Sequence, residues 1–274
     1  MRILVTNDDG VDSQGLHVLA RSLLPHGDVV VAAPDREYSG AGAGLGALHL
    51  LQPEIHRVTI EDVAEAWAVT GPPALCVMFS RLGAFGPPFD LVVSGINPGA
   101  NVGRAVYHSG TVGAALTARA GGITGIAISQ SVNEGGVEGQ GWDDMLVGQR
   151  WETAGAVATA VVEALLAKPP TAPVVVNINV PNCDLDQVKG WRQAKVGAIP
   201  PRVVKKVRLD PKIGHEGAFH IRMDWGDPVL LPEDTDGGAV ERNEIAVTYL
   251  SALAAERDAD ISAAAAALDR LLAR

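Results

Sequence analysis

Continuous apolar runs alternate with helical patterns along most of the chain, and this alternation is the feature that most limits the possible folds. Residues 2–6 form one apolar run, residues 15–24 place their leucines on one helical face, and residues 28–33 form a second run. Such runs are typical of strands buried on both faces of a parallel sheet. The first 33 residues therefore predict a β-α-β unit with a right-handed crossover.

The same rhythm continues toward the middle of the chain. Further buried strands are predicted at 90–94, 123–128 and 173–180, and helices at about 71–82, 111–120 and 150–167. An order of this kind predicts an α/β fold, in which a Rossmann-like, doubly wound and mostly parallel sheet is covered by helices on both faces.

Four segments depart from this rhythm. Alternating stretches at 46–69 predict a β-hairpin, and the polar, Gly-rich residues 131–141 predict a mobile loop. Residues 199–228 predict an arm that packs on another subunit; the alternative is that its basic residues, Arg202, Lys205, Lys206 and Arg208, draw anionic substrate toward the cleft. The last predicted element is an Ala-rich helix at about 258–273. The predicted division is one α/β domain made of 1–198 plus 229–257, an oligomerisation arm at 199–228, and a C-terminal helical segment at 258–274.

The charge balance limits the possible partners. With 32 acidic and 22 basic residues, the formal net charge is −10 and the pI about 5.1, which argues against a protein that binds nucleic-acid duplexes. No apolar run reaches the roughly 18 residues of a membrane span. Cys76 and Cys183 lie far apart and no signal peptide is evident, so we expect a cytoplasmic protein with reduced thiols.

Two adjacent carboxylates follow the first predicted strand. Asp8 and Asp9 stand in the sequence NDDG, and two such charges about 4 Å apart repel by roughly 4 kcal/mol at an effective dielectric constant of 20. Solvent, a shared proton, a basic group or a metal ion must offset this repulsion. The alternative is structural: Asp9-Gly10 forms a turn and Asp8 caps a helix.

Other polar side chains follow the neighbouring strands. Ser39 stands among glycines after the second strand, and Asn97 and Asn101 stand in SGINPGANVG after the strand at 90–94. If these strands are parallel neighbours, their loops open at the same edge of the sheet, where α/β proteins bind ligands. Carboxylate, hydroxyl and amide oxygens suit Mg²⁺ or Mn²⁺ better than zinc.

A possible anion site follows in YHSGTVGAALTA. Ser109 is placed to cap the predicted helix, and Gly110 and Thr111 stand in its first turn. Free amides at a helix start bind anions, as phosphoryl chemistry requires. The sequence leaves open whether Ser109 contributes to such a site or only caps its own helix.

The motifs NDDG, APDREYSGAG, SGINPGANVG, YHSGTVGAA, VNINVP and EDTDGGAV occur in this order over about residues 1–250. In this arrangement the chain resembles the SurE family of survival-protein nucleotidases. The resemblance implies a metal-dependent phosphatase that removes phosphate from nucleoside 5′- and 3′-monophosphates, with subunits joined by extended arms into homodimers or homotetramers.

The resemblance also implies roles for individual residues. One divalent ion, Mg²⁺ or Mn²⁺, would be held in each subunit, and the phosphate would be surrounded by residues of the loops after it. The implied metal ligands are Asp8, Asp9, Ser39 and Asn97, with Asp8 and Asp9 also catalytic, and the implied phosphate-binding residues are Asn101, Ser109, Gly110 and Thr111. Asp234 and Asp236 match a further family segment, for which a turn and a cap are the expected roles.

Alternatives remain at the level of sequence. The nucleophile is either water or one of Asp8 and Asp9. A sugar-nucleotide-dependent transferase could hold a diphosphate-bound ion with the same acidic pair, although the chain looks short for a second nucleotide-binding half. A non-catalytic nucleotide sensor on the same scaffold is the other alternative.

Overall fold

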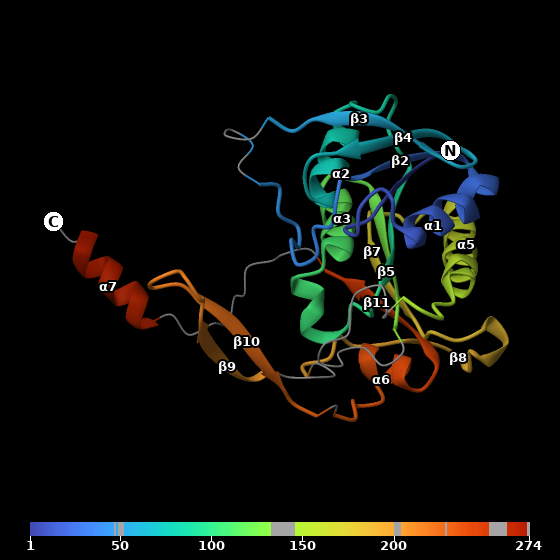
Figure 1. Cartoon of the computed structure of the whole chain (residues 1–274). Coiled ribbons are helices and arrows are strands. Elements are labelled where there is room, and N and C mark those ends of the chain that lie inside the picture. Colours follow the sequence, from blue (N-terminus) through green and yellow to red (C-terminus); the bar gives the residue numbers. More distant parts are fainter. Residues whose placement is uncertain are drawn as a thin grey trace.

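The computed structural model describes residues 1–46, 48, 52–132, 146–199, 204–227, 229–251 and 262–272. In this part of the chain the main sheet has nine strands (Figure 1). In spatial order they are β3 (Ile55–Ile60), β4 (Val63–Val69), β2 (Asp28–Pro34), β1 (Arg2–Thr6), β5 (Leu91–Pro98), β6 (Thr124–Gln130), β7 (Val175–Val180), β11 (Glu244–Leu250) and β8 (Gly190–Gln193).

The centre of the sheet is parallel, as predicted. Strand β1 pairs in parallel with β2 on one side and with β5 on the other, and the parallel order continues through β6 and β7. The predicted hairpin is confirmed, because β3 pairs antiparallel with β4; β4 also joins β2 in parallel and so extends the main sheet. At the other end, β11 is antiparallel to β7.

Helices cover both faces of the sheet, which confirms the α/β fold. Figure 1 shows α1 and α5 together on one face and α2 and α3 on the other. The described helices are α1 (Gln14–Leu23), α2 (Pro73–Arg81), α3 (Gly110–Ala120), α5 (Trp151–Ala167), α6 (Asp236–Glu241) and α7 (Ser262–Leu272), with short 3₁₀ turns η1 (Leu24–His26), η2 (Gly103–Tyr107) and η3 (Leu185–Gln187).

The alternation of side chains along β1 divides the core between these two faces. Ile3 and Val5 pack with Leu16 and Leu19 of α1, whereas Leu4 belongs to the cluster that includes Val77 of α2. Successive residues of a strand point to opposite faces, so an unbroken apolar strand is needed when both faces are covered. This is why RILVT, with no polar alternation, occupies the middle of the sheet.

Residues Val204–Pro211 (β9) and Phe219–Trp225 (β10) pair antiparallel in a sheet of their own. Figure 1 shows this hairpin projecting from the main sheet toward α7. It falls within the predicted arm at 199–228. Helix α7 begins at Ser262, inside the predicted helix 258–273, while residues 252–261 and most of the predicted loop 131–141 lie outside the described residues.

Three elements of the described structure were not predicted: β8, β11 and α6. Strand β8 has the short polar sequence GWRQ, and β11 has the sequence EIAVTYL and is antiparallel, so neither gives the long apolar run of a central parallel strand. Within the described residues, no helix is long and apolar enough to cross a membrane.

Candidate functional site

The candidate site lies at the carboxyl ends of β1 and β5, where the chain reverses the direction in which it builds the sheet. After β1 the chain continues to β2 on one side, while β5 lies on the other side and leads to β6. Ligands of doubly wound folds bind at such a switch point. Asp8 and Asp9 directly follow β1, and Asn97 is near the end of β5, so the predicted parallel neighbourhood of these strands is confirmed.

Asp8 is a buried carboxylate fixed by the first turn of α3. Its Oδ1 accepts a hydrogen bond of 2.5 Å from the Thr111 hydroxyl, and its Oδ2 accepts one of 3.1 Å from the Gly110 amide. The side chain is only 3% exposed. A carboxylate at a helix start gains from the amide donors and the helix dipole. The first turn of α3 therefore holds Asp8 itself.

Ser109 is the cap of the same helix. Its hydroxyl oxygen accepts a hydrogen bond of 3.1 Å from the Val112 amide, which confirms the capping role that the sequence left open. The hydroxyl proton is not used by this bond. A contact of Ser109, Gly110 or Thr111 with phosphate therefore stays a prediction. For Gly110, phosphate would have to compete with Asp8, which already accepts a hydrogen bond from the Gly110 amide.

Asn97 is oriented by its own loop. Its side-chain Nδ2 donates to the Gly99 carbonyl at 2.7 Å and to the Pro98 carbonyl at 3.3 Å. These bonds direct the amide oxygen the other way, and Oδ1 lies 3.2 Å from the Thr111 hydroxyl oxygen that also bonds Asp8. The structure thus brings Asp8 and Asn97 to one side chain, Thr111, whose hydroxyl lies within hydrogen-bond distance of an oxygen of each.

Asp9 differs from Asp8 because its buried carboxylate has little support: the Asn7 side chain acts to lower its pKa, but its geometry is too poor for a hydrogen bond. Neither of its two side-chain oxygens has a hydrogen-bond partner among the described residues. Burial, followed by the charges of Asp8 and Glu37, raises the pKa of Asp9 to about 8. Burial also raises the pKa of Asp8, against the opposing effect of its bond from Thr111. Buried polar atoms in native proteins almost always find partners, so the Asp9 oxygens call for one beyond the described residues.

This raised pKa predicts how the ion-free protein responds to pH. The pKa of Asp9 is about 8 in the folded protein and about 3.9 in an unfolded chain, so between these values the folded state binds more protons. In excess chelator, the free energy of unfolding should therefore be highest below about pH 4 with respect to this group and fall toward pH 8, by at most about 1.4 kcal/mol per pH unit. Urea unfolding at several pH values measures this slope; an equal slope in Asp9→Asn would contradict it.

The glycine-rich loop after β2 lies against Asp8 and α3. The Tyr38 amide donates to the Asp8 carbonyl at 2.7 Å, and the Gly42 amide donates to the His108 carbonyl at 3.0 Å. A Cβ atom at Gly113 would lie 2.1 Å from the Gly42 carbonyl oxygen, so the backbone of the loop sits directly on α3. The glycines of this segment thus allow a close approach of its backbone to the helix.

Ser39 follows Tyr38 and so lies beside the segment that bonds Asp8. Its side chain is exposed, and the described part of the chain shows no hydrogen bond between its hydroxyl and either carboxylate. Its role as a metal ligand therefore stays a prediction.

Asn101 is held on the other side of the site by β6 and β7. Its side-chain Nδ2 donates to the Ser129 hydroxyl at 2.9 Å, and its amide donates to Asn179 Oδ1 at 2.7 Å. The side chain of Asn177 in turn donates to the Asn101 carbonyl at 3.0 Å. These bonds fix the loop after Asn97, but no described bond joins Asn101 to Asp8 or Asp9, so its phosphate contact also stays a prediction.

A buried carboxylate that sequence reasoning undervalued supports this loop. Asp236, which is 1% exposed, accepts hydrogen bonds of 2.9 Å from the amides of Gly103 and Gly197. The expected cap in this segment belongs instead to Thr235, whose hydroxyl accepts from the Gly238 amide at 3.2 Å. Asp236 therefore ties the start of η2 to the segment after β8. The motif EDTDGGAV drew attention to Asp236, but it gives no indication of the amides of Gly103 and Gly197, which are far away in the sequence.

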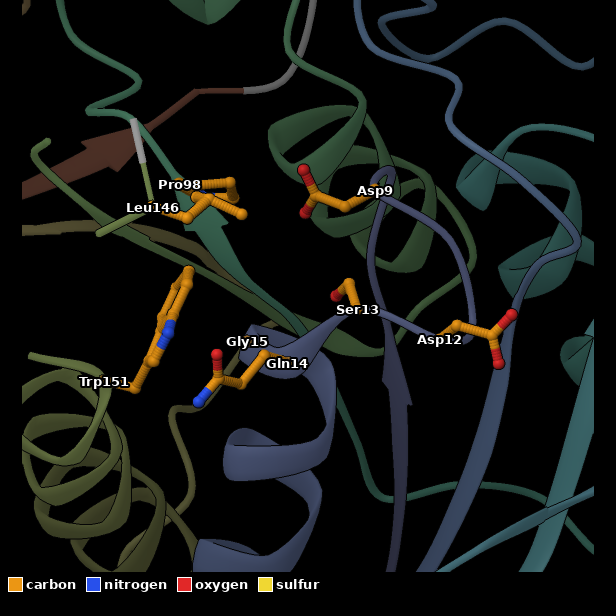
Figure 2. A pocket seen from close by; sticks show the side chains of 8 residues that line it. All are labelled: Asp9, Asp12, Ser13, Gln14, Gly15, Pro98, Leu146 and Trp151. Carbon is orange, nitrogen blue, oxygen red and sulfur yellow. The ribbon is translucent and has the colours of Figure 1, made fainter. Parts of the chain in front are cut away.

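A cavity of about 300 Å³, here called the Asp9 cavity, opens beside the acidic pair. Figure 2 shows it between the start of α1 and the start of α5, with Asp9 at one side and Trp151 at another. Its lining includes Asp9, Ser13, Gln14, Pro98, Leu146 and Trp151. The unpartnered carboxylate thus borders open space.

Comparison of the sequence with models of protein families shows to which family the chain is related. The family model described as survival protein SurE matches residues 3–200. The chain belongs to the SurE family. This confirms the resemblance drawn from the motifs.

Two SurE relatives and one SurE structure show how far the likeness extends. The 5′-nucleotidase SurE of Mannheimia succiniciproducens is 36% identical over 255 residues, which cover 90% of this chain and 91% of the relative. The 5′/3′-nucleotidase SurE of Citrobacter koseri is 35% identical over 256 residues, covering 91% and 90%. The crystal structure of the SurE protein from Aquifex aeolicus matches with a TM-score of 0.72 and 28% identity over 99% of both chains.

The packing of Gly110 gives a prediction for this SurE-family site. A Cβ atom there would lie 2.7 Å from the Asp8 Cβ and 2.8 Å from its Oδ2, so Gly110→Ala must displace Asp8. We expect a loss of about 1–3 kcal/mol in the free energy of unfolding and a marked loss of hydrolysis. Thermal unfolding and phosphate release measure the two effects.

The matched control is Gly155→Ala in α5, where the nearest atom to the new Cβ would be the Ser22 hydroxyl at 3.0 Å. That variant should keep its activity, because a hydroxyl can rotate away and alanine favours a helix. Equal behaviour of the two variants would show that the close contact between Gly110 and Asp8 is not needed.

Proposed function

We propose that the protein is a metal-dependent phosphatase that hydrolyses nucleoside 5′-monophosphates, and also 3′-monophosphates, to nucleoside and inorganic phosphate. The relatives that cover nine tenths of the chain carry the names 5′-nucleotidase and 5′/3′-nucleotidase. The observation that carries the proposal is the buried Asp9 carboxylate beside Asp8 at the switch point of the sheet, since neither of its oxygens has a hydrogen-bond partner in the described part of the chain.

The residues of the site fit a hard divalent cation. Asp8 and Asp9 offer carboxylate oxygens, and Asn97 presents an amide oxygen that its loop has turned toward Thr111. Among the described residues, no group of three or more His, Cys, Asp or Glu side chains is placed to hold a metal ion. The proposed ligands therefore combine two carboxylates with neutral amide and hydroxyl oxygens, and they include neither sulfur nor imidazole. We propose one Mg²⁺ or Mn²⁺ per subunit, held by Asp8, Asp9 and Asn97 and, through a movement of its exposed side chain, Ser39. Such an ion neutralises the charge that develops on phosphate oxygens as the ester bond breaks.

Hydrogen bonds within the protein fix the orientation of the side chains that would take part in the reaction. Gly110 and Thr111 hold Asp8 in one orientation, and the loop carbonyls do the same for Asn97, so these acceptors need little rearrangement when charge changes. The Ser109 hydroxyl proton and the loop that carries Asn101 are the donors that we propose for phosphate. Asp9, with two free oxygens, is the group best able to bind the cation or to receive a proton from the attacking water.

Phosphate release from a panel of nucleoside 5′- and 3′-monophosphates, with Mg²⁺ or Mn²⁺, tests the proposal. Hydrolysis of at least one monophosphate, dependent on the ion, is the expected result. Tight binding without phosphate release would favour the sensor alternative, and transfer of sugar from a nucleotide donor would favour the transferase. Either outcome would overturn the phosphatase assignment.

We also propose that the subunits associate through the arm into a homodimer or homotetramer. On the β9–β10 hairpin, Leu209 pairs opposite Ile221 and Val207 opposite Met223, so these four side chains share one face. Each is about half exposed or more, and a two-stranded hairpin with a bare apolar face is marginally stable in water. A second copy of the chain would cover this face.

Light scattering tests the assembly. Ile221→Asp should lower the molecular mass to that of a smaller species, because a charge on the apolar face opposes its burial. The control His220→Asp changes the opposite face of the same strand and should leave the mass unchanged. Wild-type mass equal to one chain at all concentrations would contradict the proposed association.

The free thiols of Cys76 and Cys183 accord with the proposed cytoplasmic location.

A further inference from the structure

The Asp9 cavity has a charge pattern that does not suit phosphate. Its charged lining residues are Asp9 and Asp12, and none of the described residues around it carries a positive charge. Apart from the cation proposed at Asp9, nothing in the lining of the cavity would compensate the charge of a phosphate dianion. The rest of the cavity therefore fits a neutral part of a ligand whose phosphate is bound at that cation.

The walls of the cavity combine apolar surface with one adaptable polar group. Pro98, Leu146 and Trp151 give apolar walls. Figure 2 shows the Gln14 carboxamide directed toward Trp151, with Asp9 across the cavity, while Asp12 points away from it. A flat apolar wall that faces a carboxamide suits a molecule with a planar ring face and polar edges.

Gln14 is free to contact such a molecule. It is the first residue of α1, its side chain is exposed, and the described structure shows no hydrogen bond to it. The neighbouring Ser13 hydroxyl, in contrast, already accepts from Asn7 Nδ2 at 2.8 Å and from the Leu16 amide at 3.3 Å. A carboxamide both donates and accepts, so it can pair with the edges of more than one base.

We propose that the Asp9 cavity binds the nucleoside part of the substrate, with Gln14 as the residue that contacts the base or ribose. This inference rests on the proposed function. It adds the position of the nucleoside, which is the leaving group when the phosphate ester is hydrolysed. A volume of about 300 Å³ is at the lower end of the range for small-molecule pockets, so it admits one nucleoside and not a longer chain of them.

Filling the cavity tests the proposal. Gln14→Phe should raise the KM for nucleoside monophosphates about 10-fold or more with little change in kcat, because the ring takes the space of the nucleoside. Inhibition by inorganic phosphate should stay unchanged, since we propose that phosphate binds at the cation and not against Gln14. The matched control is Gln52→Phe, the same substitution at an exposed glutamine outside the cavity. A second variant, Gln14→Ala, should change the relative KM values for different bases while leaving the cavity open.

Direct binding of adenosine and cytidine by calorimetry separates this inference from the proposed function. Binding to the wild type that Gln14→Phe weakens, and Gln52→Phe does not, supports the cavity even if no phosphate is released. Equal KM values and equal nucleoside binding in all variants would overturn it, whether or not the protein hydrolyses nucleotides. A parallel weakening of phosphate inhibition in Gln14→Phe would also overturn it, because the cavity would then serve the phosphate.

Discussion

Asp9→Asn is expected to lose more than about 100-fold in kcat/KM while keeping its fold. Removal of a residue that only supports a metal ligand typically costs about 10–100-fold, and the loss of a ligand should exceed this. The neutral amide cannot balance the charge of the ion, although it occupies the same volume. Phosphate release under saturating Mg²⁺ or Mn²⁺ measures the loss.

The same substitution should stabilise the ion-free protein. The Asp9 carboxylate is buried, neither of its oxygens is paired within the ranges that the structure describes, and burial and the neighbouring charges raise its pKa to about 8. At pH 8 in chelator, Asp9→Asn should therefore raise the free energy of unfolding by about 1–3 kcal/mol. A gain in stability joined to a loss of activity is the pattern expected of a functional group.

Asp186→Asn serves as the control, because it makes the same chemical change at an exposed position of η3. It should alter neither activity nor stability by a measurable amount. If Asp9→Asn instead hydrolyses nucleoside monophosphates at the wild-type rate, and still requires the ion, then Asp9 is not a ligand.

Removal of divalent ions should abolish hydrolysis by the wild type. Lewis-acid stabilisation of a phosphoryl transition state contributes several kcal/mol, so its loss corresponds to a decrease of roughly 1,000-fold or more. Addition of Mg²⁺ or Mn²⁺ in excess of the chelator should restore the rate. The matched control is the same chelator already saturated with Mg²⁺.

A second measurement keeps this prediction independent of turnover. Either ion should raise the melting temperature of the wild type, since a ligand that binds only the folded state stabilises it. The ion should have little effect on the melting temperature of Asp9→Asn. Full activity after dialysis against chelator would exclude the ion from the reaction.

The parallel core was predictable because its signals are local. An unbroken apolar run such as residues 2–6, followed by an amphipathic helix and a second run, has few alternatives in α/β proteins. The convergence of Asp8 with Asn97 followed from this topology. The edge of the sheet was not predictable in the same way, because β8 and β11 are stabilised by neighbours distant in the sequence.

The details of the site depend on contacts that no motif encodes. The sequence placed Gly110 and Thr111 near an anion, but only the fold shows that the anion they bind is Asp8. Residue spacing likewise cannot reveal that Asn97 is turned by its own loop carbonyls, or that Asp236 reaches the amides of Gly103 and Gly197. These are long-range packing outcomes rather than local preferences.

Asp8 and Asp9 have different roles because Asp8 is hydrogen-bonded to the first turn of α3. Asp8 belongs to the architecture as much as to the chemistry, since its carboxylate secures the helix whose glycine packs against it. Asp9 makes no bond of this kind to the described helices. A substitution of Asp8 would thus disturb both the scaffold and the reaction, whereas a substitution of Asp9 should impair the reaction without loosening the scaffold.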